Sequence, residues 1–205
     1  LTGPHMLSKT LLDRHYSSVT ELAWVIGRVL AAQVADIDPE VIQVDEANIT
    51  GHPSEGQWAA DAINLVLDAA TRAKEKGVHL CFGNYGGQSI QKGHWKQLIE
   101  FMNRLRCDHV VLEFAFRGYD ELAYFKDELD PRIGIGVGVI DVKTNTVEPP
   151  DLVARRLEQA AKFVGADRIK WAHPDCGFWM LKRSVSDRKM ASLVQGRDLY
   201  LAGGR

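Results

Sequence analysis

Residues 133–140 read Ile-Gly-Ile-Gly-Val-Gly-Val-Ile, an uncharged run in which glycine alternates with β-branched residues. Short runs without charge are typical of strands that are buried on both faces of a parallel sheet. The glycines occupy every second position inside the run, so they do not form the strand-to-helix turn of a dinucleotide-binding fingerprint. They indicate instead a crowded strand that another part of the chain or a ligand approaches closely.

Similar segments recur on both sides of this run, with helical patterns between them. Short, mostly apolar stretches predict four more strands, over residues 41–44, 78–82, 109–114 and 168–172. Apolar residues at helical spacing predict helices over residues 20–35, 57–76, 95–105, 119–126, 150–164 and 186–195. Alternating strands and helices indicate an α/β fold with a parallel sheet and covering helices.

Two architectures fit this alternation, an open doubly wound sheet and a TIM-type (β/α)₈ barrel. Residues with chemically active side chains follow or end four of the predicted strands: Asp45, Glu46, His79, Cys81, Glu113, Asp175 and Cys176. This distribution favours the barrel, whose catalytic residues come from the carboxyl ends of several strands.

The number of predicted strands is smaller than eight. Residues 1–4 read as the end of one further strand, and a whole barrel needs about 250 residues, against 205 in this chain. We therefore expect residues 1–205 to form the C-terminal part of one barrel domain, with two to three N-terminal strands missing from this chain.

The composition excludes several classes of protein. The chain has 25 Lys and Arg against 27 Asp and Glu, and 45% of its residues are hydrophobic, as in ordinary globular domains. The charge balance argues against a nucleic-acid binder, and the sequence contains neither a membrane-spanning stretch nor a signal peptide pattern. Three widely spaced cysteines fit a reducing compartment. We expect a cytoplasmic protein with no nucleic-acid or membrane partner, while the sequence leaves the oligomeric state open.

The tripeptide His79-Leu80-Cys81 is the sharpest local feature. Residues two apart in a strand point to the same side, so imidazole and thiol face one side together and form half of a zinc site. The alternative is a core histidine beside an ordinary buried cysteine.

Two further residues fit the zinc interpretation. Glu113 lies in an apolar run, where a carboxylate needs a cation or an ion pair, with Arg117 as one alternative partner. Cys176 lies in the turn of residues 173–177, which places its thiol at the mouth of the barrel. Cys107 precedes its strand, and we expect it to be inert.

Several motifs carry a resemblance to a known family: residues 1–4, residues 42–46, His79-x-Cys81 with Gly83-Asn84, Glu113, residues 134–141 and Pro174-Asp175-Cys176-Gly177. They occur in the order seen in cobalamin-independent methionine synthases. The chain resembles the C-terminal zinc barrel of that family and its single-barrel relatives, which include core-type methionine synthases and epoxyalkane:coenzyme M transferases.

The resemblance implies a metal site and an activity. It maps the four Zn²⁺ ligands onto His79, Cys81, Glu113 and Cys176, and it implies methyl or alkyl transfer to a thiol. The expected acceptor is homocysteine, and the expected donor is 5-methyltetrahydrofolate or methylcobalamin. Zinc suits this chemistry because a free thiol, with a pKa near 8.5, is mostly protonated at neutral pH, whereas a metal-bound thiol is deprotonated.

The resemblance also implies roles for other residues. Asp45 matches the aspartate that binds the amino group of the substrate, and we include Glu46 and Asn84 from the same motifs among the substrate-binding residues. Asp175 is a candidate catalytic acid or base. His173 is a second catalytic candidate, with a hydrogen bond to its own loop as the alternative.

Three other functions remain open from the sequence. One is alkyl transfer from an epoxide to coenzyme M or a similar thiol. Another is a barrel like that of uroporphyrinogen decarboxylase, which needs no metal. The last is a truncated, inactive relative that keeps the ligands.

Overall fold

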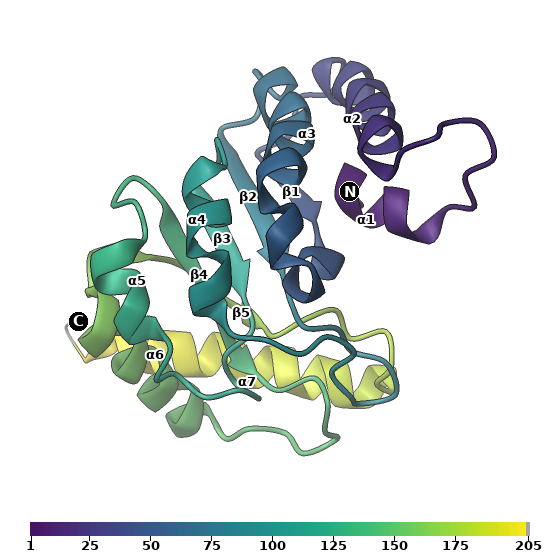
Figure 1. The fold of residues 1–205 in the computed structure, drawn as a ribbon. Coiled ribbons are helices and arrows are strands. Elements are labelled where there is room, and N and C mark those ends of the chain that lie inside the picture. The colour runs from purple at the N-terminus through teal and green to yellow at the C-terminus, as the bar shows by residue number, and fades with distance from the viewer. Residues whose placement is uncertain (204–205) are drawn as a thin grey trace.

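A computed structural model describes residues 1–203 and contains one parallel sheet (Figure 1). Its five strands are β1 (Val41–Asp45), β2 (Glu75–Leu80), β3 (His109–Leu112), β4 (Gly134–Ile140) and β5 (Ile169–Pro174). They lie side by side in chain order, β1-β2-β3-β4-β5, and all neighbours are parallel. A doubly wound sheet reverses its strand order at a switch point, whereas a barrel keeps adding strands in one direction. The order confirms the α/β fold of TIM-barrel type.

The first residues add to the edge of the sheet, as predicted. Thr2 forms a parallel bridge with Asp45. The Gly3 amide donates to the Asp45 carbonyl over 2.9 Å, and the Asp45 amide donates to the Leu1 carbonyl over 2.8 Å. Within residues 1–203 the sheet stays open between this edge and β5.

Seven α-helices accompany the strands in the described residues: α1 (Pro4–Thr10), α2 (Val19–Ala35), α3 (Gly56–Ala69), α4 (Ile99–Arg104), α5 (Leu122–Glu128), α6 (Pro150–Val164) and α7 (Arg183–Ala202). Four short 3₁₀ turns complete the order: Ala47–Gly51, Pro53–Glu55, Trp95–Leu98 and Ala166–Arg168. No helix within residues 1–203 is both long and apolar enough to cross a membrane.

The core lies between the helices and one face of the sheet. Ile42 and Val44 of β1 are buried in this core, together with α3 residues such as Ile63 and Leu67. Val41, which alternates with them, is 40% exposed. Asp45 of β1 and His79 of β2 belong to this opposite, less covered face of the sheet, because strand residues alternate between faces and their neighbours Val44, Val78 and Leu80 lie in the core.

The structure corrects several of the predicted elements. The helix predicted over residues 57–76 ends at Ala69, and Glu75 already belongs to β2. The polar start of β2 conceals the strand because its partners are distant in sequence: the Trp171 Nε1–H donates to Glu75 over 2.9 Å. The final helix is longer than the predicted 186–195, and α1 was not predicted.

Helix α7 is fixed to the loop after β4 by a buried lysine. The Nζ of Lys189 donates to the carbonyls of Asp141 and Thr146 and, over 2.9 Å, to the Glu148 carboxylate. The Arg156 guanidinium donates to the same carboxylate over 3.4 Å. A buried lysine with every donor used fixes the position of this loop, which borders the candidate site.

Glu46 anchors α1. Its fully buried carboxylate accepts the backbone N–H groups of His5 and Met6 over 2.9 and 2.8 Å. These are amides of the first helical turn, which lack partners inside the helix. Burial raises the pKa of Glu46 to about 8, although both N–H bonds act in the opposite direction.

This pKa predicts a pH-dependent stability. In the folded protein Glu46 keeps its proton up to about pH 8, whereas the unfolded chain releases that proton near the ordinary carboxyl pKa of 4.5. The free energy of unfolding should therefore fall as the pH rises between these two values, by at most about 1.4 kcal/mol per pH unit. Glu46→Gln cannot ionise and should remove this contribution. Urea unfolding of the unmodified protein and of Glu46→Gln at several pH values measures this difference in the free energy of unfolding. An equal pH dependence in both proteins would disprove the raised pKa of Glu46.

Candidate metal centre

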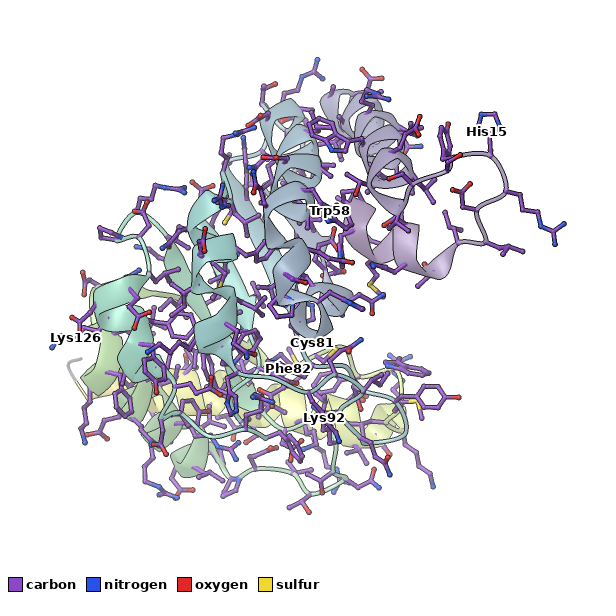
Figure 2. The ribbon with its side chains drawn as sticks, in the orientation of Figure 1. His15, Trp58, Cys81, Phe82, Lys92 and Lys126 are labelled. Atoms are coloured by element: carbon purple, nitrogen blue, oxygen red, sulfur yellow. The ribbon has the colours of Figure 1, made fainter. Side chains whose placement is uncertain are left out.

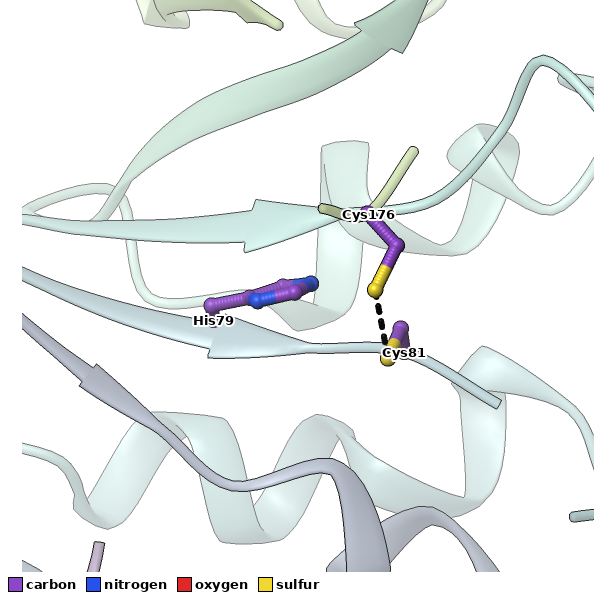
Figure 3. Close-up of side chains that lie close together, drawn as sticks. All are labelled: His79, Cys81 and Cys176. Atoms are coloured by element: carbon purple, nitrogen blue, oxygen red, sulfur yellow. Dashed lines mark hydrogen bonds between the residues drawn. The ribbon is translucent and has the colours of Figure 1, made fainter. Parts of the chain in front are cut away.

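Two strand ends bring an imidazole and two thiols together. His79 lies near the end of β2, Cys81 follows that strand, and Cys176 follows β5. Their ligand atoms all lie within 4.8 Å of one another, and the two sulfur atoms are 3.7 Å apart (Figure 3). Figure 2 shows Cys81 beside Phe82 at the carboxyl end of β2. One imidazole and two thiolates are typical zinc ligands.

His79 is oriented for metal binding through Nε2. Its Nδ1 lies 3.3 Å from a carboxylate oxygen of Asp45, which accepts the Nδ1–H. Its Nε2 is buried and has no hydrogen-bond partner within residues 1–203. Burial disfavours the imidazolium, but Asp45 and the nearby Cys176 outweigh it and raise the pKa of His79. A carboxylate on one ring nitrogen with the other nitrogen free is the usual arrangement behind a metal-bound histidine.

The two thiols share a hydrogen bond. The bond donated by Cys81, with His79 nearby, lowers the pKa of Cys176 to about 6. The pKa of Cys81 is raised by this same bond and by burial. The opposite directions of these two pKa shifts favour a thiolate at Cys176 that accepts the hydrogen bond from the Cys81 thiol. Metal binding would release the remaining proton.

Glu113 is fully buried close to this group but outside its 4.8 Å limit. One carboxylate oxygen lies 3.0 Å from the Lys143 Nζ, and the other accepts the Phe82 amide over 3.3 Å. Its ion-pair partner is therefore Lys143. Arg117, the partner considered from the sequence, donates to the Gly93 carbonyl and to Glu121.

Sequence reasoning missed Lys143. Its signal was available, because the residue comes three positions after the end of β4 and so lies at the carboxyl edge that holds the other candidates. A lysine among Asp141, Thr144 and Asn145 reads as an ordinary polar loop.

Asp175 organises the loop after β3. Its fully buried carboxylate accepts the backbone N–H groups of Phe114, Ala115 and Phe116 over 2.9, 2.9 and 2.8 Å. Burial raises the pKa of Asp175 to about 7, against the effect of these bonds. Both carboxylate oxygens are thus used by the backbone.

The alternating glycines of β4 face the neighbouring strand end. A Cβ at Gly138 would lie 2.1 Å from the Asp175 Oδ1, and one at Gly136 would lie 3.1 Å from the His173 ring. The close approach predicted for these glycines is confirmed. The pattern leaves room for His173 and Asp175.

The remaining predicted residues differ in whether their polar side-chain atoms are free to bind a substrate. His173 donates from Nδ1 to the Pro174 carbonyl over 2.6 Å, its Nε2 is buried without a partner in the described residues, and burial lowers its pKa to about 4. Both side-chain polar atoms of Asn84 are likewise buried and unpartnered. Glu46, by contrast, is engaged with α1. The roles of Glu113, Asp45, Glu46, Asn84, His173 and Asp175 stay predictions.

The fold and this group define the class: a TIM-type parallel α/β domain with a candidate metal centre at the carboxyl ends of its strands. The family model of the cobalamin-independent synthase catalytic domain matches residues 1–197. The chain therefore belongs to the cobalamin-independent methionine synthase family, as its motifs predicted.

Similarities to individual proteins support this family membership. The chain is 29% identical to a methionine synthase of Thermococcus kodakarensis over 203 residues, covering 97% of this chain and 56% of the relative. It is 28% identical to a methionine synthase of Sulfurisphaera tokodaii, with 97% and 55% covered. The structure of a B12-independent methionine synthase from Shewanella sp. W3-18-1, in complex with selenomethionine, superposes with a TM-score of 0.82 at 26% identity, covering 99% of this chain and 61% of that one. The chain thus spans about half the length of the curated relatives it matches.

Proposed function

We propose that this protein uses zinc to transfer a methyl or alkyl group to a small thiol, with homocysteine as the acceptor and 5-methyltetrahydrofolate or methylcobalamin as the donor. One observation carries the proposal: the ligand atoms of His79, Cys81 and Cys176 lie within 4.8 Å of one another. The names of the relatives and the selenomethionine bound to the Shewanella protein, a selenium analogue of methionine, support it.

The residues fit the metal. His79 would bind through its unpartnered Nε2, Cys81 and Cys176 through sulfur, and Glu113 would supply a carboxylate. Zinc supplies a Lewis acid that keeps a bound thiol deprotonated yet nucleophilic. His79, Cys81 and Cys176 supply three protein ligands, the number that catalytic zinc sites use, and the fourth position would be taken by Glu113 or by the substrate thiol.

Other side chains would hold the substrate and position protons. Asp45 orients His79 and, being partly exposed, can also receive the amino group of an amino acid. Asn84 offers one amide acceptor and two donors. His173 is neutral at pH 7 because burial lowers its pKa to about 4, so its Nε2 is an acceptor while Nδ1 keeps the proton.

The proposal is tested by product analysis. Zinc-loaded protein is incubated with homocysteine and each methyl donor separately, and methionine is measured by mass spectrometry, with Cys81→Ser as the control. We expect methionine from one donor and none from the variant. If the protein instead formed an adduct of coenzyme M with an epoxide, coenzyme M would be the acceptor in place of homocysteine and the epoxide would be the alkyl donor. Turnover that persists without metal would favour a metal-free barrel, and a zinc-loaded protein with no activity would indicate an inactive relative.

A further inference from the structure

Two residues of β1 form a side-chain pair next to the candidate metal centre. Gln43 and Asp45 are two positions apart in this strand, so their side chains lie on the same face of the sheet. The Gln43 Nε2 donates to the Oδ1 of Asp45 over 2.8 Å, and the same Oδ1 lies 3.3 Å from the His79 Nδ1. Oδ1 thus accepts two hydrogen bonds, whereas Oδ2 accepts none from residues 1–203.

The strand register explains why both donors reach the same carboxylate. In the pairing of β1 with β2, Asp45 lies opposite His79, and Gln43 lies opposite Gly77. Gly77 has no side chain, and a Cβ there would lie 2.4 Å from the Nε2 of His109, which fills that space. Gln43 therefore has no polar side chain directly opposite it on β2, and its amide reaches along its own strand to Asp45.

The two carboxylate oxygens of Asp45 differ in what they can bind. Oδ1 is held on His79, where it orients the imidazole that would bind the metal through Nε2. Oδ2 is a free acceptor, and the Asp45 side chain is 43% exposed, so a molecule that enters the site can reach it. An ammonium group suits this oxygen, because its hydrogen bonds to a carboxylate are charge-assisted and therefore stronger than neutral ones.

Gln43 matters because a carboxylate can rotate. With His79 as its only donor, Asp45 could turn about its terminal torsion and present either oxygen to the Nδ1–H. An incoming ammonium group would then compete with His79 for the same oxygens. The second donor, Gln43, fixes one orientation of the carboxylate, so that an ammonium group can be bound without disturbing the metal ligand. This effect concerns only those thiols that also carry an amino group.

We propose that Gln43 is a positioning residue that makes the site selective for thiols with an amino group: it holds Oδ1 of Asp45 on His79 and thereby keeps Oδ2 for the ammonium group of the substrate. This inference rests on the proposed function, because it takes the thiol to bind a metal held by His79 and the amino group to bind Asp45. It deepens that function by assigning substrate specificity to a residue outside the ligand set.

The test compares two thiols that differ only in the amino group, homocysteine and 4-mercaptobutanoate, on the Co²⁺-loaded protein. Their affinities are measured by titration of the sulfur-to-cobalt charge-transfer band. Gln43→Met keeps the length of the side chain but removes its N–H donors. The affinity for homocysteine should fall about tenfold in this variant, and the affinity for 4-mercaptobutanoate should stay within about twofold.

A second substitution shows whether the effect acts through Asp45. Asp45→Asn removes the charge that binds the ammonium group, and adding Gln43→Met to it should lower the affinity for homocysteine by no more than about another twofold. The inference would be wrong if Gln43→Met weakened both thiols equally or left the affinity for homocysteine unchanged. A further loss of about tenfold in the Asp45→Asn background would also overturn it.

The wild-type protein separates this inference from the proposed function. If it gave no charge-transfer band with either thiol, the proposed metal-dependent function would fail and the inference with it. If it bound both thiols and preferred homocysteine, and Gln43→Met kept the same preference, the inference alone would fail. Circular dichroism checks folding, and Gln43→Leu, which also lacks N–H donors, replaces Gln43→Met if that variant unfolds.

Discussion

Replacing Cys176 with serine should lower the affinity of the protein for zinc at least about 100-fold, or roughly 3 kcal/mol. The substitution exchanges one of two thiolates, the strongest zinc ligands of the group, for a hydroxyl that stays protonated at neutral pH. The Cys176 thiolate is favoured even before metal binds, because the Cys81 hydrogen bond lowers its pKa to about 6. Chelator competition measures the loss.

Cys107 provides the matched control. It is a buried cysteine whose pKa is raised to about 12, mainly by burial, and it lies outside the metal-binding group. Cys107→Ser should change stability but leave zinc affinity within about twofold. Equal losses in both serine variants would show that the effect comes from folding rather than from ligation.

Asp175→Ala should destabilise the protein by about 3 kcal/mol, since it leaves three loop amides without their acceptor and each unsatisfied buried N–H costs about 1–3 kcal/mol. The amides belong to Phe114, Ala115 and Phe116, directly after Glu113. Loss of their anchor should also disturb Glu113. Urea unfolding measures the first effect, and zinc affinity the second.

Asp175→Asn separates shape from charge in this prediction. The asparagine keeps one acceptor oxygen in a side chain of the same size, so its destabilisation should be about half that of the alanine variant. If Asp175→Ala cost less than about 1 kcal/mol, the carboxylate would not organise this loop. A structural role of this kind is compatible with a catalytic one only if substrate binding frees an oxygen.

The fold and the compact part of the site were predictable because their signals are local. Short apolar runs identified all five strands, and the glycines of β4 correctly indicated a close approach. The spacing of His79 and Cys81 placed both side chains on one face of the strand. The position of Cys176 was predictable because it follows another strand, and the carboxyl ends of parallel strands meet at the same edge of the sheet.

The failures depended on partners that are distant in the chain. Helix α1 is short and begins on amides that the buried Glu46 accepts, some 40 residues later. The start of β2 is polar because Glu75 bonds to Trp171 across the sheet. Lys143, in the loop after β4, pairs with Glu113, which directly follows the neighbouring strand β3. None of these contacts leaves a periodic pattern in the sequence.

X-ray absorption at the zinc edge of the metal-loaded protein decides whether Cys81 and Cys176 bind zinc, because it counts the metal's ligands by element and distance. We expect two sulfur atoms at about 2.3 Å, with nitrogen or oxygen atoms at about 2.0–2.2 Å, around one zinc. A shell of nitrogen and oxygen alone would show that zinc binds elsewhere and that the thiols of Cys81 and Cys176 do not form a metal centre.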